Sequence, residues 1–369
     1  MHKVLFAIPM LDKGGPDRVF FELLRRLDRT KYQPIVVTSQ PEGHYLSRLP
    51  GDVERHCLGA ETSLATRYPV VPLARLVRAL RPSVVLATLR MCFTAGLAAP
   101  MFPRKTKLVT RPANHISSNH AELIRAAPIK HRVSFTLNRF TLTRADHLIC
   151  QGADIANDLA RLALRAPMTT IGNPIDLVEV DRLAAASDER LPGAPALLAV
   201  GRLSAQKGFD ILLPAFAQLR LTSPAAHLTI VGTGPDRAAL EAQAAALGLT
   251  DHVTFRGFVQ NPYPLMRAAD VYVLSSRYEG FPNVALESLA CGTPVVATTC
   301  PGVGELILPG INGWLAPVED VAGLARALVA ATTTKLDPAT IRHSVQSRFD
   351  AGLIARRYEE VFERVIATA

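Results

Sequence analysis

The sequence predicts an α/β protein built from two doubly wound domains in tandem. Its 369 residues exceed what one hydrophobic core usually organises. Two successive series of short apolar strands alternate with helices, and a polar, proline-containing stretch separates the two series. The two halves of the chain also differ in charge, which favours two domains with different partners.

The first series of strands begins at the N-terminus. Its strand-like runs are residues 3–9, 33–39, 83–89, 107–112 and 147–152. A Gly14-Gly15-Pro16 turn precedes the first helix, and a second helix over 73–82 ends at a proline. Continuous apolar strands joined by helices indicate a parallel sheet that is buried on both faces.

A second series begins after the linker 172–194. Its strand-like runs are 195–203, 227–235, 253–259, 271–276 and 294–298, and the tail from 341 to 367 reads as helix. We expect one domain over 1–175, completed by a C-terminal helix over 352–369, and a second over 176–351. Ligands of such sheets bind at the carboxyl ends of the strands.

Charge and cysteine content limit the class of protein. Residues 1–172 hold 25 Lys and Arg against 12 Asp and Glu, and residues 173–369 hold 16 against 20. The basic half suits a phosphorylated ligand, an anionic membrane or nucleic acid, and the alternative is charge that only keeps the protein dissolved. Five scattered cysteines without a C-x-x-C favour reduced thiols in a cytosol. No run approaches the roughly 18 apolar residues of a membrane span.

Two segments of the second half look suited to phosphate groups. Arg202 and Lys207 follow a strand and precede a helix that begins near Gly208, an arrangement that suits a diphosphate. Gly232 and Gly234 form a G-x-G turn before another helix. The alternatives are solvated loop charges and an ordinary strand–helix turn.

The stretch SSRYEGFPNVALESLACGTPVVA holds two glutamates, Glu279 and Glu287. Pro282 suits the first turn of a helix that Gly292-Thr293-Pro294 ends, so the amides of Asn283 and Val284 lie at its N-terminus. The two carboxylates then need not converge as an acid/base pair. The alternative is a glutamate stabilised by the helix dipole and an ordinary helical glutamate.

Other chemistries find little support in the sequence. Gly14 and Gly15 permit close backbone approach before a helix, but no G-K-[ST] follows, which disfavours a P-loop ATPase. The chain has no D-x-D, no H-E-x-x-H and no G-x-S-x-G. We therefore expect no metal site and no cofactor.

Taken together, GGPDRVF, GRLSAQKGFD, VGTGP, FRGFV and SSRYEGFPNVALESLACGTPVVAT resemble the retaining glycosyltransferases of family 4. The resemblance covers most of the chain and is most specific over residues 200–300. It implies the GT-B architecture, in which two Rossmann-like domains face each other across a cleft that holds a nucleotide-sugar. The first domain would then bind the acceptor and the second the donor, and the C-terminal helix would cross back to the first.

The resemblance also implies roles for individual residues. The catalytic set would be Arg202 and Lys207 on the diphosphate, Glu279 on the donor sugar, and His115 in TRPANHIS, for which a buried structural histidine is the alternative. The donor's nucleotide and phosphates would meet Gly14, Gly15, Gly232, Phe258, Val259, Asn283, Val284 and Glu287. The donor's sugar would meet Glu279, Gly280 and Phe281.

The excess positive charge is concentrated over residues 104–144. Its members are Arg104, Lys105, Lys107, Arg111, Arg125, Lys130, Arg132, Arg139 and Arg144, with Glu122 as the one acidic residue among them. Interleaved apolar residues suggest contact with an anionic membrane and a lipid-linked acceptor, and the alternative is a crossover helix with cations in water. No aromatic platform accompanies the charge, which disfavours nucleic acid.

We therefore expect a metal-independent transfer of a hexose or N-acetylhexosamine to a glycan or polyprenyl-linked lipid in cell-surface polysaccharide or glycolipid assembly. A UDP-sugar is the expected donor and a GDP-mannose-type donor its alternative. The rival classes are a glycoside hydrolase or phosphorylase that uses Glu279 and Glu287, and a non-catalytic nucleotide-sugar-binding protein. The expected location is the cytoplasm, either free or peripheral on the inner face of the membrane.

Overall fold

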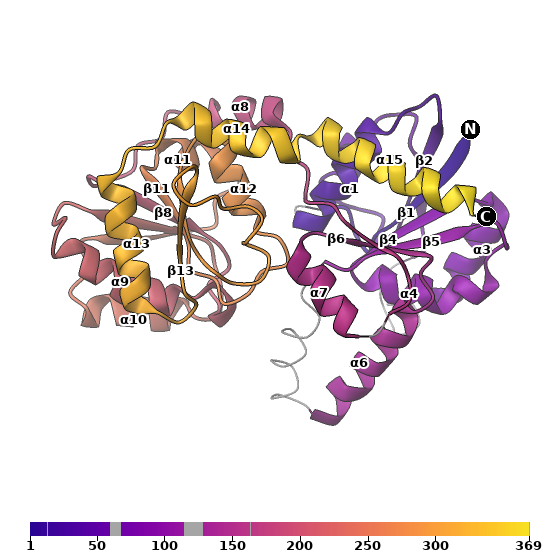
Figure 1. The fold of residues 1–369 in the computed structure, drawn as a ribbon, viewed down its shortest axis with the longest axis horizontal. Coiled ribbons are helices and arrows are strands. Elements are labelled where there is room, and N and C mark those ends of the chain that lie inside the picture. The colour runs from indigo at the N-terminus through magenta and orange to yellow at the C-terminus, as the bar shows by residue number, and fades with distance from the viewer. Residues whose placement is uncertain (13, 60–67, 114–127, 163, 369) are drawn as a thin grey trace. The chain divides into compact units, whose positions relative to one another are not determined.

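The chain folds into two compact units, each with its own parallel sheet. The computed structural model describes residues 1–12, 14–59, 68–113, 128–162 and 164–368, with the backbone alone described over 128–134. The first unit consists of Met1–Pro174 and Ala351–Ala369, and the second of Ile175–Asp350 (Figure 1). The fold class predicted from the sequence, two α/β units that each have a parallel sheet, is confirmed.

The first unit contains a seven-stranded sheet in the order β3-β2-β1-β4-β5-β6-β7. Its strands are β1 (His2–Ala7), β2 (Tyr32–Thr38), β3 (Glu54–Cys57), β4 (Val84–Thr88), β5 (Lys107–Arg111), β6 (His147–Cys150) and β7 (Met168–Thr170). Its helices are α1 (Gly15–Arg26), η1 (Leu46–Arg48), α3 (Val70–Leu80), α4 (Arg90–Ala98), η2 (Ala99–Met101), α6 (Pro128–Leu142), α7 (Ala153–Arg161) and α15 (Ala351–Ala367).

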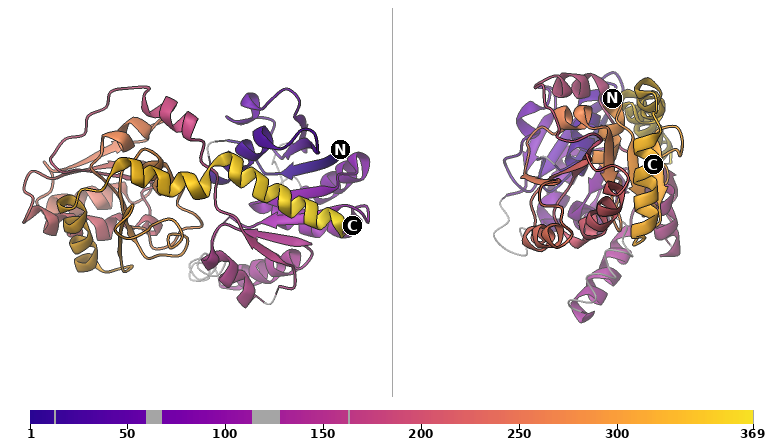
Figure 2. Two further views of the ribbon diagram at one scale, coloured as in Figure 1. Left: turned by 45° about the horizontal axis from the view of Figure 1, so that its top comes forward. Right: turned by 90° about the vertical axis from the view of Figure 1, so that its left-hand side faces the viewer.

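The C-terminal helix α15 belongs to the first unit, as expected. Its buried residues, among them Ile354, Tyr358 and Phe362, recur on one helical face and join the core that also holds Phe6 and Phe20. The ring of Phe362 lies edge-on to that of Phe6, with 6.5 Å between the centroids. Figure 2 shows the helix lying along this unit.

The second unit contains a six-stranded sheet in the order β10-β9-β8-β11-β12-β13. Its strands are β8 (Ala196–Val200), β9 (His227–Val231), β10 (Val253–Gly257), β11 (Val271–Leu274), β12 (Val295–Thr298) and β13 (Gly313–Ala316). Its helices are α8 (Leu177–Ala184), η3 (Ala205–Lys207), α9 (Phe209–Arg220), α10 (Arg237–Ala246), α11 (Tyr263–Ala268), α12 (Asn283–Ala290), α13 (Val321–Thr333) and α14 (Pro338–Phe349).

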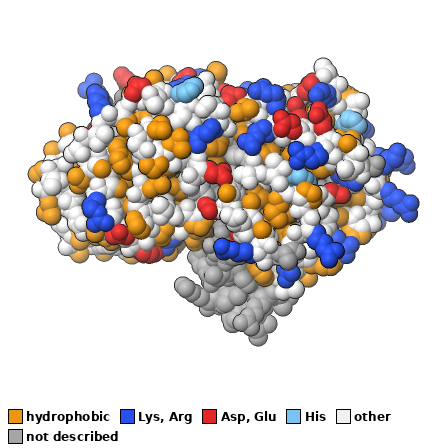
Figure 3. Space-filling view, in the orientation of Figure 1, with side chains coloured by type: hydrophobic (Ala, Val, Ile, Leu, Met, Phe, Trp, Pro, Cys, Tyr) orange, Lys and Arg blue, Asp and Glu red, His pale blue; other side chains and the backbone are white. Residues whose placement is uncertain are grey.

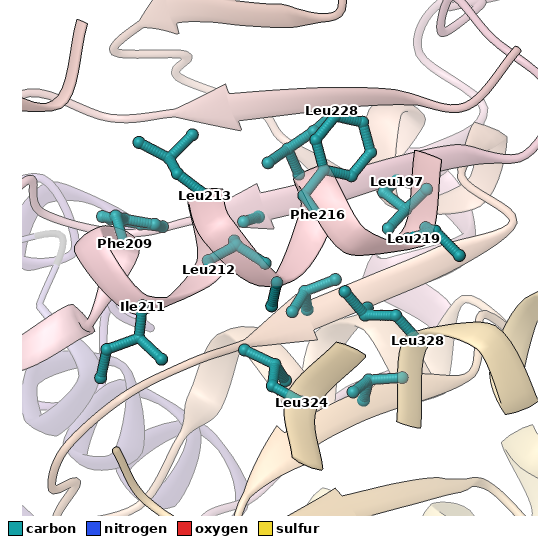
Figure 4. Packing of buried hydrophobic residues seen from close by; sticks show 14 of the residues in the cluster. Leu197, Phe209, Ile211, Leu212, Leu213, Phe216, Leu219, Leu228, Leu324 and Leu328 are labelled. Carbon is teal, nitrogen blue, oxygen red and sulfur yellow. The ribbon is translucent and has the colours of Figure 1, made fainter. Parts of the chain in front are cut away.

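Helix α9 shows how the second unit is held together. Figure 4 shows its apolar side chains between strand residues such as Leu197 and Leu228 and the helix residues Leu324 and Leu328 of α13. Phe216 of α9 is fully buried in this cluster. Burying a side chain of this size stabilises the fold by about 1.5–3 kcal/mol. The core therefore fixes the start of α9, which is where the loop carrying Lys207 ends.

The strand order creates a switch point in the second sheet. Strand β8 lies between β9 and β11, and both pairings are parallel. The chain leaves β8 toward β9 on one side, and the later strands are added on the other side. Loops that follow β8 and β11 therefore leave the same edge of the sheet side by side, which is where open α/β sheets bind ligands.

Several details differ from the sequence prediction. Strands β3, β7 and β13 had not been predicted. The expected linker 172–194 contains α8, which Asp176 caps by accepting hydrogen bonds from the amides of Val178 and Glu179. The single helix expected near the C-terminus is two helices, and the chain passes between them at Asp350.

Candidate functional site

Two loops at the carboxyl edge of the second sheet carry the residues of interest. We call Ser204–Gly208, after β8, the lysine loop and Ser275–Gly280, after β11, the glutamate loop. Their strands are neighbours in the sheet, so residues far apart in the sequence meet here. The site described below lies within the second unit.

Lys207 and Glu279 form an ion pair between the two loops. The Lys207 Nζ lies 2.6 Å from Glu279 Oε1, and the Ser276 hydroxyl donates to the same oxygen at 2.6 Å. The side chains of Lys207 and Glu279 are 18% and 8% exposed, so water screens the pair only weakly. Two donors on one oxygen hold the carboxylate group in a single orientation.

Close packing of the backbone fixes where Lys207 stands. Gly208 has φ +62, and a Cβ at this position would lie 2.1 Å from the carbonyl oxygen of Ser275. The Ser275 hydroxyl donates to the carbonyl oxygen of Lys207 at 2.9 Å. Only glycine permits this approach, which explains the glycine that follows the lysine.

Arg202 differs from Lys207 in its surroundings. Its side chain is exposed, and it has no hydrogen-bond or ion-pair partner in the part of the chain that the structure describes. A cation without a protein partner at a strand's carboxyl end remains able to bind an anion. Its role on a diphosphate stays a prediction.

Helix α12 begins beside the glutamate loop. Pro282 is its N-cap rather than its first residue, and the helix starts at Asn283. The Asn283 amide already donates to the carbonyl oxygen of Phe281 at 2.9 Å. The Val284 amide has no acceptor among the described residues, so it is the better anion donor of the two predicted.

The two glutamates occupy different environments around one tyrosine. Glu279 is buried in its loop, whereas Glu287 is half-buried within α12. The hydroxyl of Tyr272 donates to the carbonyl oxygen of Val200 at 3.1 Å. Burial, and then the nearby charges of Glu279 and Glu287, raise the pKa of Tyr272 well above its usual range. Both carboxylates are therefore within electrostatic reach of this phenol.

Gly232, Phe258 and Val259 lie along the same edge, after β9 and β10. A Cβ on Gly232 would lie 1.9 Å from the carbonyl oxygen of Gly201, so strand packing alone requires glycine here. Phe258 is 68% exposed, and Val259 packs partly against the core. An exposed aromatic ring at a strand's carboxyl end is available for a flat ligand.

The structure changes the interpretation of Phe281. Its ring is buried and lies edge-on to Phe349 of α14, with 5.5 Å between the centroids. The side chain belongs to the core, so only the backbone of Gly280 and Phe281 remains for a donor sugar. The sequence did not reveal this, because the partner ring is distant along the chain.

The predicted site residues of the first unit are Gly14, Gly15 and His115. Gly15 opens α1, and the Gly14 amide donates to the Asp17 carboxylate at 3.0 Å, which occupies the start of that helix. Burial raises the pKa of Asp17. A phosphate at Gly14 would have to share this amide with Asp17. His115 lies outside the described residues.

In the basic region 104–144, Arg111 is fully buried and Lys107 is half-buried. The guanidinium of Arg111 is buried and donates to the Tyr358 hydroxyl at 2.9 Å and to Asn173 Oδ1. Lys107 donates to the carbonyl oxygen of Thr368 at 3.0 Å. Including Arg111 in a basic surface was wrong, because its guanidinium is buried. Both residues join β5 to the C-terminal part of the first unit.

Two polar residues of the glutamate loop were missed by the sequence analysis. Ser276 donates to Glu279, and its own carbonyl oxygen accepts from the Thr298 hydroxyl at 2.5 Å. Arg277 reaches back toward the lysine loop through the carbonyl oxygen of Ala205, at 2.5 Å. Their position directly after a buried strand was the one sequence feature that pointed to them. The sequence analysis of this stretch considered the two glutamates instead.

Thiol chemistry finds no support near this site. The cysteines Cys57, Cys92, Cys150, Cys291 and Cys300 are all free. Burial raises the pKa of Cys92, Cys150, Cys291 and Cys300 to about 12, so these thiols stay protonated.

The described residues contain no group of three or more His, Cys, Asp or Glu arranged for a metal ion. No described helix is long and apolar enough to cross a membrane.

Comparison with known proteins gives two family matches. The family described as Glycosyltransferase Family 4 matches residues 13–179, and the one described as Glycosyl transferases group 1 matches residues 194–333. Together they leave unmatched only the two ends and a short stretch around the boundary between the units.

Curated relatives carry glycosyltransferase names. The lipopolysaccharide core biosynthesis glycosyltransferase LpsE of Rhizobium meliloti is 33% identical over 183 residues, which are 50% of this chain and 53% of LpsE. The glycogen synthase of Mycobacterium tuberculosis is 33% identical over 229 residues, 59% of this chain and 54% of that protein. The chain thus spans about half the length of these relatives.

A solved structure supports the fold over nearly the whole chain. Anabaena Alr3699/HepE in complex with UDP superposes with a TM-score of 0.76 at 21% identity, and the match covers 98% of this chain and 100% of that one. At this identity the likeness speaks for the fold alone. The two family matches rest on the sequence and together cover most of it. The chain belongs to the glycosyltransferases of family 4, the glycosyl transferases group 1.

Proposed function

We propose that the chain transfers a hexose or N-acetylhexosamine from a nucleotide-sugar to a glycan or lipid-linked acceptor, with retention and without a metal ion. The observation that carries the proposal is the joining of Lys207 and Glu279 at the switch point of the second sheet. A cation for phosphate and a carboxylate for sugar hydroxyls stand there side by side. The names of the relatives, which include lipopolysaccharide core biosynthesis, support a cell-surface glycan or glycolipid as the product.

The proposed reaction depends on departure of the nucleoside diphosphate. Lys207, Arg202 and the Val284 amide would stabilise the charge that develops on the leaving phosphate. Preorganised donors of this kind act most strongly on charge that grows in the transition state. The leaving phosphate would take the acceptor's proton on the same face of the sugar, so that the chemistry needs no carboxylate pair.

A glycosidase would use the same glutamates differently. It would need one protonated and one ionised carboxylate on either side of a glycosidic bond. The Oε1 atom of Glu279 is already engaged by the Lys207 ammonium group and the Ser276 hydroxyl, which suits a role in holding the donor. The surroundings therefore favour transfer over glycoside hydrolysis.

UDP is the proposed nucleotide, and a GDP-sugar is the alternative. The complex of the structural relative HepE with UDP supports the first choice. The exposed ring of Phe258 would lie against the base, and neighbouring backbone groups would select it. A thermal-shift panel of UDP, GDP, ADP and their sugars ranks the candidates directly.

Product analysis tests the proposal itself. We expect release of a nucleoside diphosphate that depends on an added acceptor and a product that keeps the anomeric configuration of the donor. Release of free sugar from a glycan in the absence of nucleotide would favour the hydrolase. Nucleotide binding without turnover, over a broad acceptor panel, would favour a binding protein.

We also propose that the first unit contacts an anionic membrane through α6 and its neighbours. Leu137 and Phe140 are 44% and 49% exposed on this helix. The Arg144 guanidinium lies 4.9 Å from the centroid of the Phe140 ring. Apolar side chains flanked by cations suit the interface of an anionic bilayer. Lys and Arg side chains are also spread over the visible face of this unit, at the right of Figure 3.

Flotation on liposomes tests the membrane proposal. We expect binding to vesicles with anionic lipid at low salt, and loss of binding in the double variant Leu137→Ser, Phe140→Ser. The matched control is Val178→Ser, because Val178 is 80% exposed on α8 of the other unit. Absence of binding at low salt would leave α6 as an ordinary crossover helix, and the glycosyltransferase proposal would stand.

A further inference from the structure

The lysine and glutamate loops are joined by more than the ion pair between their functional side chains. The Arg277 amide donates to the carbonyl oxygen of Gln206 at 2.8 Å. The side-chain amide of Gln206 in turn donates to the carbonyl oxygen of Tyr278 at 3.0 Å. These bonds run in both directions between the loops, so a shift of one loop must move the other.

The guanidinium of Arg277 is the centre of this connection. Its Nη1 donates to the carbonyl oxygen of Ala205 at 2.5 Å, inside the lysine loop. Its Nη1 and Nη2 donate to the two carboxylate oxygens of Asp210, at 2.8 and 2.7 Å. Asp210 lies in the first turn of α9, directly after the lysine loop. One planar guanidinium group therefore binds the start of the lysine loop at Ala205 and a residue just past its end, Asp210.

A second carboxylate holds Arg277 from another segment. Glu319 Oε1 lies 2.5 Å from the Arg277 Nε. Glu319 has φ +64, a backbone conformation that residues with a side chain rarely adopt. Such conformations persist where the surrounding structure determines them, and the bond to Arg277 supplies such a determinant. All five N–H groups of a guanidinium lie in one plane, so partners on two sides fix its orientation.

We propose that Arg277 is a positioning residue that holds the lysine loop and the glutamate loop together, so that Lys207 and Glu279 are fixed relative to the donor. The inference rests on the proposed function, because positioning matters only if Lys207 acts on a leaving diphosphate. The hydrogen bonds of the Arg277 guanidinium described above go to Ala205, Asp210 and Glu319, and none of them goes to the side chain of Lys207 or Glu279. Its action runs through the backbone of Ala205 and Gln206 and through the start of α9.

The test compares Arg277→Gln with a matched control. Arg342→Gln is suitable, because Arg342 also joins a carboxylate, Asp181, to a backbone carbonyl, that of Ala290, each at 2.7 Å. The side chains of Arg277 and Arg342 are 25% and 28% exposed. We expect Arg277→Gln to lower kcat roughly 10- to 100-fold, the range that misplacement by about an ångström produces. Arg342→Gln should leave kcat unchanged.

A double-variant cycle separates positioning from general damage to the fold. If Arg277 acts through Lys207, adding Arg277→Gln to Lys207→Ala should lower kcat by less than about threefold further, because coupled residues are not additive. An equal loss of kcat in both backgrounds would show independent damage and would overturn the proposal. The melting temperatures of Arg277→Gln and Arg342→Gln should be similar.

Amide hydrogen exchange measures how firmly Arg277 holds the lysine loop, and it does not require enzyme turnover. The Lys207 amide donates to the carbonyl oxygen of Ser204 at 2.9 Å and the Gly208 amide to that of Ala205 at 3.2 Å. We expect both amides to exchange at least about tenfold faster in Arg277→Gln and at the parent rate in Arg342→Gln. Unchanged exchange in Arg277→Gln would overturn the inference. If the parent protein turned over no nucleotide-sugar, the proposed function would fail while this measurement still judged the role of Arg277.

Discussion

The ammonium group of Lys207 lies 2.6 Å from a carboxylate oxygen of Glu279, and the two residues follow neighbouring strands of one sheet. The pair places a fixed positive charge at the edge where α/β sheets bind phosphorylated ligands. It also offsets the charge of Glu279, whose side chain is only 8% exposed. The Lys207 ammonium group would therefore already be oriented when a donor diphosphate binds. Binding would then not have to supply the free energy of ordering that side chain.

Removal of the lysine side chain should affect turnover above all. We expect Lys207→Ala to lower kcat roughly 100-fold or more, since the loss of one preorganised donor to developing charge costs about 2.7–4 kcal/mol. The control is Lys335→Ala, because Lys335 is an exposed lysine between α13 and α14 of the same unit. Rates are normalised to folded protein by titration with nucleotide. Turnover near the parent value would remove Lys207 from the mechanism.

Chelation tests the proposed independence from metal ions. Arg202 and Lys207 would supply the positive charge that a divalent cation supplies to diphosphates elsewhere. We expect the rate of donor consumption to be the same after dialysis against EDTA as before. A strict requirement for added Mg²⁺ would contradict this expectation and would assign part of the leaving-group stabilisation to the ion.

The sequence was sufficient for the pattern of buried strands but not for the edges of the sheets. Strands such as β4 and β8 are apolar and stand out, whereas β3 reads ERHC and β7 is three residues long. Short or charged edge strands have little hydrophobic signal of their own, and only pairing with a neighbour defines them. The same limit explains why β13 was not predicted.

The candidate residues of the site could be proposed from the sequence, but the contacts among them could not. Lys207 and Glu279 were each expected near the donor from local motifs, yet their ion pair depends on β8 lying next to β11. The burial of Phe281 depends likewise on α14, which supplies Phe349. Arg277 makes its bonds to segments distant in the sequence, so no local pattern could reveal them.

The glycine after Lys207 offers a test of how tightly the two loops are packed. Gly208→Ala would place a Cβ 2.1 Å from the Ser275 carbonyl oxygen at φ +62. Gly248 has a similar φ, +68, with no atom within 4 Å, so Gly248→Ala isolates the backbone cost of about 1–2 kcal/mol. We expect Gly208→Ala to lower the free energy of unfolding by about 1–3 kcal/mol more than that.

Urea denaturation of both glycine variants, followed by fluorescence, measures the difference. The chain has one tryptophan, and Trp314 lies in β13 of the same unit as both glycines. Equal destabilisation by the two variants would mean that the loops separate easily, against the close packing described here. Donor affinity should fall only in Gly208→Ala, because only that variant displaces the lysine loop.

Two histidines should make the stability of the protein depend on pH. His147 is buried in the first unit, with a ring nitrogen 2.8 Å from the Thr169 hydroxyl, and His227 lies in the second unit, 2.9 Å from that of Thr254. Burial lowers the pKa of both, helped at His147 by the charge of Arg364. Each therefore binds a proton more weakly in the folded than in the unfolded chain.

The sign of the effect follows from this difference. Above about pH 6.5, the usual pKa of histidine, both states are neutral and the histidines contribute no pH dependence. As the pH falls below that value the unfolded chain takes up protons that the folded chain refuses, so the free energy of unfolding decreases until the lowered folded pKa is passed. We expect urea midpoints to fall between pH 7.5 and 5.5. The fall detected by Trp314 fluorescence should be smaller in His227→Gln, and an unchanged slope in that variant would show that His227 is not the group responsible.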